Sequence, residues 1–332
     1  MTKTYIIAEA GVNHNGRLDL AFRLCDAAKA AGADAVKFQT WVTEKIVTAG
    51  TALAAYQAQN LGAEGSQFEM LKRLELSYAQ FADIQAYCTR IGIQFLSTGD
   101  NPEDIDFLLS LGMPLIKLGS GDVTNIPLLR HAGRCGVPVL LSTGMADLTQ
   151  VRRAYAELQG AGAQDITVLH CTTNYPCPPE EVNLRAMQTL AGALGCPVGY
   201  SDHTVGTEVP VAAVALGACV IEKHLTLDRT MEGPDHAAST EPAAFAEMVR
   251  QIRAIEAALG DGIKRPNPSE QAIAGKVLKR ILAACPVRRG DILTEDKLCV
   301  KRAPAGPGAD RWDEICGTPA TRDYRPDEAI EL

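Results

Sequence analysis

One structural unit recurs eight times in this chain of 332 residues: a short apolar run, a turn with glycine or polar residues, and a stretch with helical spacing. The eight runs predicted as strands are Tyr5–Ala10, Ala35–Thr40, Ile93–Thr98, Leu115–Ser120, Val139–Thr143, Ile166–Thr172, Val198–His203 and Cys219–Thr226. Segments such as Leu18–Ala31 and Leu148–Leu158 have the spacing of amphipathic helices. Eight β-α units in about 260 residues are typical of an α/β TIM (β/α)8 barrel, which we predict. A doubly wound open sheet is the alternative, although it usually contains fewer units.

The composition changes after the eighth unit. We assign residues 1–262 to the barrel, the proline-rich and polar residues 263–274 to a linker, and residues 275–332 to a small β-rich domain. Because about 60 residues are marginal for an independent core, we expect this domain to dock on the barrel or on a second subunit. One insertion, Val42–Leu76, interrupts the barrel pattern and is expected to form either a lid or substrate wall, or a surface loop.

Charge and cysteine usage exclude several classes of protein. The formal net charge of −8 argues against a general surface for nucleic acid or an anionic membrane. The ten cysteines are scattered without C-x-x-C pairs, which is typical of reduced thiols. Met1–Ala8 resembles the start of a strand rather than a signal peptide, and no apolar run approaches a membrane span. We therefore expect a cytoplasmic protein with no nucleic-acid or membrane partner.

Two histidines end consecutive predicted strands. His203 shares a face with Ser201, and His224 shares a face with Glu222, because strand side chains alternate. Adjacent parallel strands would bring both imidazoles to the end of the barrel where chemistry takes place. Neutral imidazole binds Mn²⁺, Fe²⁺, Co²⁺ or Zn²⁺, and two protein ligands leave positions open for catalysis. Each histidine could instead be a satisfied core residue, but the pairing favours a metal.

Two lysines stand inside predicted barrel strands. Burying Lys37 and Lys117 is costly unless each meets an anion. The hydroxyls of Ser120 and Ser142 and glycine-bearing turns lie in register with them, which favours a phosphate or phosphate-plus-carboxylate ligand. The alternative is that each lysine pairs with an internal carboxylate, such as Glu9 or Glu222.

Six motifs resemble those of one family. They are Ile7–Gly16 (IAEAGVNHNG), Val36–Thr40 (VKFQT), Ile116–Gly121 (IKLGSG), Leu141–Met145 (LSTGM), Gly199–Thr204 (GYSDHT) and Ile221–Thr226 (IEKHLT). The chain resembles the sialic acid synthase family, whose members make nonulosonic acids from phosphoenolpyruvate and an N-acylated mannosamine-type sugar. The resemblance covers nearly the whole chain and implies that the C-terminal part is an antifreeze-like (SAF) domain.

The resemblance also implies a mechanism and its residues. A metal on His203 and His224, Mn²⁺ with Mg²⁺ or Co²⁺ as alternatives, would polarise the sugar aldehyde for attack by carbon 3 of phosphoenolpyruvate, and water would then displace phosphate. The implied catalytic residues are Glu9, Glu222, His203 and His224. The implied phosphoenolpyruvate contacts are Lys37, Thr98, Lys117, Ser120, Ser142 and Ser201. The implied sugar contacts are Gln39, Asp122, Tyr175, Asp235 and Arg302. Because the family arginine that Arg302 matches reaches the sugar from the partner's SAF domain, a domain-swapped homodimer is also implied.

The chain departs from the family pattern around the sugar. Asp122 replaces a glutamate, Ser97–Asn101 (STGDN) replaces the usual Ser-Thr-Pro-Phe, and Thr173 stands where neuraminate-type enzymes carry asparagine. His170–Pro176 nevertheless resembles the legionaminic acid synthases, which implies 2,4-diacetamido-2,4,6-trideoxy-mannose as the substrate. N-acetylneuraminate synthesis from N-acetylmannosamine is the alternative, and pseudaminic acid synthesis is a third.

Three other classes of protein explain only part of this pattern. A Schiff-base aldolase would use a barrel lysine but has no need for two histidines at metal spacing. A metal-dependent hydrolase would use the histidines but not two interior lysines. A sugar-binding protein without catalysis would leave the charges at the strand ends unexplained.

Overall fold

Eight parallel strands close into a barrel in the computed structural model, which describes residues 3–53, 57–58 and 65–331. In chain order they are β1 (Tyr5–Gly11), β2 (Ala35–Thr40), β3 (Gln94–Gly99), β4 (Ile116–Leu118), β5 (Val139–Ser142), β6 (Ile166–Cys171), β7 (Val198–Asp202) and β8 (Val220–His224). Each strand pairs with the next, and β8 pairs with β1. The TIM barrel is therefore confirmed, and the open-sheet alternative is wrong.

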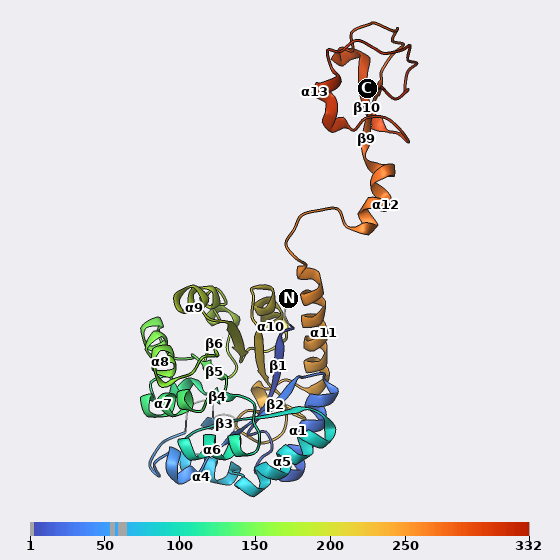
Figure 1. Cartoon of the computed structure of the whole chain (residues 1–332). Coiled ribbons are helices and arrows are strands. Elements are labelled where there is room, and N and C mark those ends of the chain that lie inside the picture. The colour runs from blue at the N-terminus through green and yellow to red at the C-terminus, as the bar shows by residue number, and fades with distance from the viewer. Residues whose placement is uncertain (1–2, 54–56, 59–64, 332) are drawn as a thin grey trace. The chain divides into compact units, whose positions relative to one another are not determined.

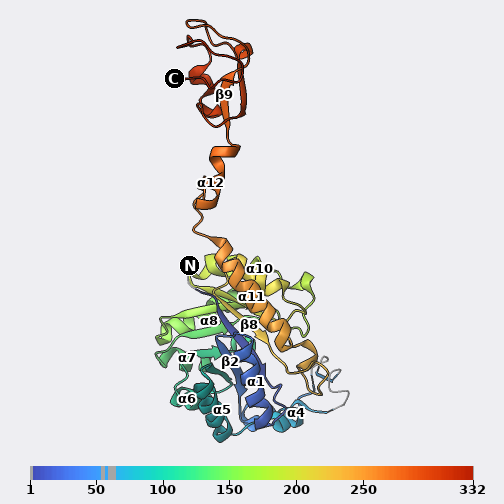
Figure 2. The same cartoon turned by 90° about the vertical axis from the view of Figure 1, so that its right-hand side faces the viewer.

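An outer layer of helices covers the strands (Figure 1). These helices are α1 (Leu18–Ala30), α5 (Tyr78–Ile91), α6 (Pro102–Ser110), α7 (Ile126–Arg134), α8 (Leu148–Ala161), α9 (Ala186–Leu194), α10 (Glu208–Ala215) and α11 (Pro242–Leu259). The long helix α11 packs beside α10 and α1 (Figure 2). None of the helices in the described part of the chain is both long and apolar enough to cross a membrane.

Local sequence explains where the helices begin and which face they bury. Ser77 and Gln80 form a capping box at the start of α5, and Asp147 does the same with Gln150 at α8. In α5 the buried residues Phe81, Ile84 and Cys88 recur every three or four positions, so one stripe faces the barrel. Short 3-10 helices stand in the loops: η1 (Ser120–Asp122), η2 (Pro179–Glu181) and η3 (His236–Ala238).

The insertion after β2 contains two short helices, α2 (Thr43–Ile46) and α4 (Gln67–Leu74). Met70 and Leu74 of α4 join Val12 and Trp41 in a small apolar cluster. This cluster anchors the described part of the insertion to the first and second strand loops. Residues 54–56 and 59–64, which belong to the insertion predicted as a lid or substrate wall or as a surface loop, lie outside the described residues.

Residues Gly262–Leu332 form a second compact unit, separate from Met1–Asp261. It contains α12 (Pro268–Val277), β9 (Lys279–Ala283), η4 (Glu295–Lys297), β10 (Leu298–Arg302), η5 (Ala309–Arg311) and α13 (Trp312–Ile315). Strands β9 and β10 pair antiparallel around a small core that includes Ile281 and Leu298. The segment predicted as a linker, 263–274, instead holds most of α12, which Asn267 caps.

Candidate active site at the carboxyl ends of the strands

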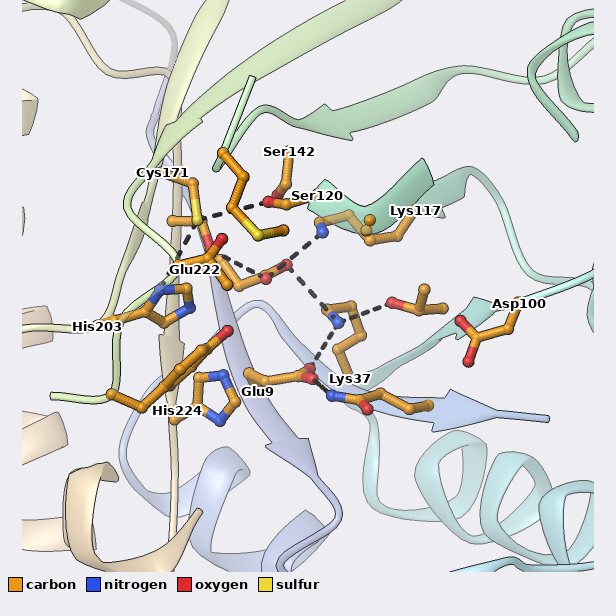
Figure 3. A pocket seen from close by; sticks show the side chains of 18 residues that line it. Glu9, Lys37, Asp100, Lys117, Ser120, Ser142, Cys171, His203, Glu222 and His224 are labelled. Atoms are coloured by element: carbon orange, nitrogen blue, oxygen red, sulfur yellow. Dashed lines mark hydrogen bonds and ion pairs between the residues drawn. The ribbon is translucent and has the colours of Figure 1, made fainter. Parts of the chain in front are cut away.

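A cavity of about 200 Å³ lies at the carboxyl ends of the barrel strands. It is lined by Glu9, Lys37, Gln39, Thr98, Asp100, Lys117, Gly119, Ser120, Gly121, Ser142, Met145, Cys171, Thr173, Tyr175, Ser201, His203, Glu222 and His224. Most residues predicted from the sequence thus meet in one place. Figure 3 shows the two imidazoles on one side and Lys37, Lys117 and Asp100 on the other.

The barrel register brings these side chains together. Glu9 of β1 lies opposite His224 of β8 and opposite Lys37 of β2. Ser201 of β7 lies opposite Glu222 of β8. Because alternate residues of a strand share a face, the polar residues at these positions point inward together while their apolar neighbours pack under the helices.

His203 and His224 face each other with ring centroids 5.4 Å apart, and the Tyr175 ring lies 4.1 Å from that of His203. The Nδ1 of His203 hydrogen-bonds the carbonyl of Thr172 at 2.7 Å, so its Nε2 keeps a lone pair for a ligand. The Nδ1 of His224 is buried without a hydrogen bond in the described structure, and it lies 3.7 Å from Asp235 Oδ2. Burial and His203 lower the pKa of His224 well below its usual value. Burial would lower the pKa of His203, but its hydrogen bond with Cys171 outweighs burial and raises the pKa. Two imidazoles held in this orientation fit a divalent metal ion.

Asp106, His131 and Cys135 form the only group of three metal-ligating side chains with ligand atoms within 4.8 Å of one another in the described ranges. None of the three lines the cavity. The Nε2 of His131 already pairs with Asp106 Oδ1 at 2.8 Å. The histidine pair in the cavity therefore offers two protein ligands, which suits an ion with open positions.

Both interior lysines have carboxylate partners. Lys37 Nζ lies 2.7 Å from Glu9 Oε2 and 3.9 Å from Glu222 Oε2, and Lys117 Nζ lies 3.6 Å from Glu222 Oε1. The internal pairing considered as the alternative is therefore present. Lys37 also donates to Thr98 Oγ1 at 2.9 Å, and Lys117 to its neighbour's carbonyl at 3.2 Å. Both lysines line the cavity as well, so binding of an anion by them stays a prediction.

The carboxyl groups of this cluster differ in their acidity. Burial raises the pKa of Glu9, although Lys37 opposes the shift. Burial alone would also raise the pKa of Glu222, but Lys117 and Lys37 outweigh it and hold the pKa below its usual value. Burial lowers the pKa of Lys117. Glu222 therefore stays ionised more readily than Glu9.

Three hydroxyl groups line the cavity on the β4 to β6 side, and two of them have no hydrogen-bond partner among the described residues. Ser142 Oγ and Thr173 Oγ1 are buried without a hydrogen bond in the described structure. Ser120 Oγ accepts from the Gly144 amide at 3.0 Å. A Cβ on Gly144 would lie 2.1 Å from Thr173 Oγ1, so only glycine fits between these hydroxyls. Unsatisfied polar atoms around one cavity indicate a polar ligand.

Three predicted sugar contacts do not line the cavity. Asp235 is buried beside His224, as described above. Asp122 in η1 accepts a hydrogen bond from Asn125 Nδ2 at 3.0 Å. Arg302 is exposed at the end of β10 in the second compact unit. Their contacts with a sugar stay predictions.

Asp100, Met145 and Cys171 line the cavity without having been predicted as site residues. Cys171 Sγ lies 3.7 Å from both Ser120 Oγ and His203 Nδ1, between the hydroxyls and the imidazoles. Its position at the end of β6 could have pointed to it. Asp100 lies in the turn whose sequence departs from the family pattern, and that departure could have indicated that Asp100 is a site residue.

Comparison with known proteins gives one consistent result. The NeuB family model matches residues 24–264. The chain is 45% identical over 332 residues to N,N'-diacetyllegionaminic acid synthase of Campylobacter jejuni, covering 99% of each chain. It is 44% identical over 318 residues to the Legionella pneumophila protein of the same name, covering 95% of this chain and 89% of that one. The crystal structure of N-acetylneuraminic acid synthetase from Leptospira borgpetersenii in complex with citrate superimposes with a TM-score of 0.73 at 35% identity, covering 82% of this chain and 90% of that chain.

Proposed function

The chain belongs to the NeuB family, and we propose that it is an N,N'-diacetyllegionaminic acid synthase, a transferase that condenses phosphoenolpyruvate with 2,4-diacetamido-2,4,6-trideoxy-mannose and releases phosphate. The observation that carries this proposal is the cavity itself. It has two imidazoles opposite two lysines, which suits an aldehyde on one side and an anionic nucleophile on the other. Higher identity to the legionaminic acid synthases than to the neuraminic acid synthetase supports the choice of sugar.

His203 and His224 would hold a divalent ion, Mn²⁺ with Mg²⁺ or Co²⁺ as alternatives. Such an ion supplies Lewis-acid polarisation of the sugar aldehyde. His203 is oriented for this role because the Thr172 carbonyl fixes its Nδ1. Asp235 and Glu9 lie near His224 and would bind a water molecule or a sugar hydroxyl beside the ion.

Lys37 and Lys117, with Thr98, Ser120, Ser142 and Ser201, would bind phosphoenolpyruvate through its phosphate and carboxylate. Its carbon 3 then forms a bond to the aldehyde carbon, and the aldehyde oxygen takes up a proton from solvent water. Water adds to carbon 2 and gives its proton to Glu222, which the lysines keep ionised. The bond between carbon 2 and the bridging oxygen then breaks as the carbon 2 hydroxyl becomes a ketone. Inorganic phosphate leaves with the bridging oxygen and takes up the proton of that hydroxyl.

The second compact unit would be the SAF domain, acting in a domain-swapped homodimer in the cytoplasm. Arg302, together with Gln39, Asp122 and Tyr175, would then contact the acylated sugar. An exposed arginine at the end of β10 is available for such a contact with another subunit. Two results together would support this arrangement. The Arg302→Ala variant should bind the acylated sugar more weakly than wild type, and both proteins should bind a sugar without the acyl group equally well.

The test is phosphate release by the purified full chain with Mn²⁺, phosphoenolpyruvate and a panel of acylated mannosamine-type sugars. We expect release only when a sugar is present, with the highest kcat/KM for the 2,4-diacetamido sugar. A preference for N-acetylmannosamine would identify an N-acetylneuraminate synthase instead. His224→Ala should abolish metal-dependent turnover, whereas His131→Ala, outside the cavity, should retain it.

A further inference from the structure

Among the residues that the structure describes, Asp100 is the carboxyl group of the cavity that has no hydrogen-bond or ion-pair partner. Its backbone amide donates to the Thr40 carbonyl at 3.3 Å, which fixes the residue at the end of β3. Its carboxylate forms neither a hydrogen bond nor an ion pair within 4.0 Å among the residues that the structure describes. Glu9 and Glu222, in contrast, are each held by lysine and by an uncharged donor, Gln39 or Ser201.

The turn that carries Asp100 is held on both sides. Gly99 packs against α6 so closely that a Cβ there would lie 3.0 Å from the Ile105 amide nitrogen. Asn101 caps α6 by accepting from the Asp104 amide at 3.2 Å, and Asp104 accepts from the Tyr78 hydroxyl at 2.5 Å. The glycine and the aspartate that replace the family's proline and phenylalanine thus form one local feature. Glycine lets α6 approach, and the capped turn holds the carboxyl at the cavity.

Charged groups from four elements face this carboxyl: Lys37 of β2, Lys117 of β4, Asp122 of η1 and Asp104 of α6. Burial and the two aspartates raise the pKa of Asp100 to about 8, although the lysines oppose the shift. Phosphoenolpyruvate is anionic at both ends, so its charged contacts in the cavity are expected to be Lys37 and Lys117. An acylated amino sugar is uncharged and carries several N–H and O–H donors, which a carboxyl group binds well.

We propose that Asp100 is a specificity-determining residue for the sugar, whose carboxyl group forms a hydrogen bond with an N–H or O–H group of the acylated amino sugar. This inference rests on the proposed function and extends it to the recognition of the second substrate. A carboxyl group at the cavity wall that is left without its partner disfavours sugars that lack the donor. Asp100 therefore restricts the range of substrates to sugars that carry a hydrogen-bond donor where the sugar meets its carboxyl group.

The test compares Asp100→Asn, which keeps size and hydrogen-bonding capacity, with Asp100→Phe, which installs the residue of the family pattern. KM and kcat are measured separately for each substrate. Asp100→Phe should lower kcat/KM for the preferred sugar by about 10- to 100-fold, and Asp100→Asn should lose less. KM for phosphoenolpyruvate should stay within about twofold in Asp100→Asn. Asp106→Asn, on the exposed side of α6, is the matched control and should behave as wild type.

Two results would overturn the proposal. One is a rise in KM for phosphoenolpyruvate with an unchanged KM for the sugar, which would make Asp100 a phosphoenolpyruvate contact. The other is an unchanged ratio of kcat/KM between two sugars in both variants. Wild-type protein that turns over none of the sugars contradicts the proposed function instead, so the two failures are distinct.

Discussion

Asp202 and Lys223 form a buried ion pair one residue before His203 and His224, between the last paired residues of β7 and β8. Asp202 also accepts from the Tyr200 hydroxyl at 3.0 Å and from Thr204 Oγ1 at 2.9 Å, and Lys223 donates to the Thr204 carbonyl at 2.8 Å. Because neighbouring residues of a strand point to opposite faces, this pair lies behind the histidines and fixes their spacing.

Removing one member of this pair should weaken both the fold and the metal site. Lys223→Met leaves a buried carboxylate unpaired, which we expect to cost about 3–5 kcal/mol in the free energy of unfolding. The altered strand ends should also weaken Mn²⁺ binding by about 10- to 100-fold. Denaturant unfolding and a Mn²⁺ titration followed by electron paramagnetic resonance measure the two effects.

The exposed pair Lys301–Asp327 is the control, and Lys301→Met should change stability by about 1 kcal/mol or less. Wild-type Mn²⁺ affinity in Lys223→Met would show that the pair does not position the histidines.

Stability should fall with rising pH because of Asp100. Its carboxyl group has a pKa of about 8 in the folded protein and an ordinary, lower value when unfolded, so the folded state binds the proton more tightly. This contribution is complete below about pH 4 and is lost as the pH rises through about 8. The difference in Tm between Asp100→Asn and wild type should therefore shift in favour of the variant from pH 5 to pH 8.5. A difference that is constant across this range would contradict the assigned ionisation.

Lys117 should contribute mainly to binding of phosphoenolpyruvate. Its hydrogen bond is to a backbone carbonyl and its carboxylate partner lies at 3.6 Å, so an anion can approach the ammonium group. Lys117→Gln should raise KM for phosphoenolpyruvate by about 10- to 100-fold, as expected for a lost charged hydrogen bond. Steady-state kinetics with the sugar saturating measure this. Lys72→Gln on the exposed side of α4 is the control. An equal effect of both variants would show that Lys117 does not bind phosphoenolpyruvate.

Gly144 should tolerate no side chain unless Thr173 is also reduced in size. The added methyl group of Gly144→Ala would meet Thr173 Oγ1 and would lie 2.9 Å from Ser120 Oγ. We expect a loss of about 1–3 kcal/mol in stability together with reduced turnover. Combining it with Thr173→Ala should recover part of both losses, as a double-mutant cycle would show. Additive losses in the double variant would mean that the two residues do not collide.

Periodicity was sufficient to predict the barrel because each strand is a continuous buried run between helical segments. It was less accurate at β4, predicted as Leu115–Ser120, because the chain turns into η1 at Ser120 and the strand is Ile116–Leu118. Strand ends also predicted most of the cavity, since alternation decides which side chains point inward.

Contacts across the barrel could not be predicted in the same way. The distance of Lys37 from Glu9 depends on the register of β1 against β2, which no local pattern encodes. Asp100 follows a strand whose end was predicted one residue too early, and its lack of a partner is visible only in three dimensions. For Asp122 the sequence could not show that Asn125 binds its carboxylate within the same turn.

The most direct measurement follows the bridging oxygen of phosphoenolpyruvate. The protein is incubated with Mn²⁺, 2,4-diacetamido-2,4,6-trideoxy-mannose and phosphoenolpyruvate labelled with ¹⁸O between carbon 2 and phosphorus, and both products are analysed by mass spectrometry. We predict equal amounts of phosphate and nonulosonic acid, with the label in the phosphate. Label retained in the sugar acid, or no phosphate release that depends on a sugar, would contradict the condensation proposed for this cavity.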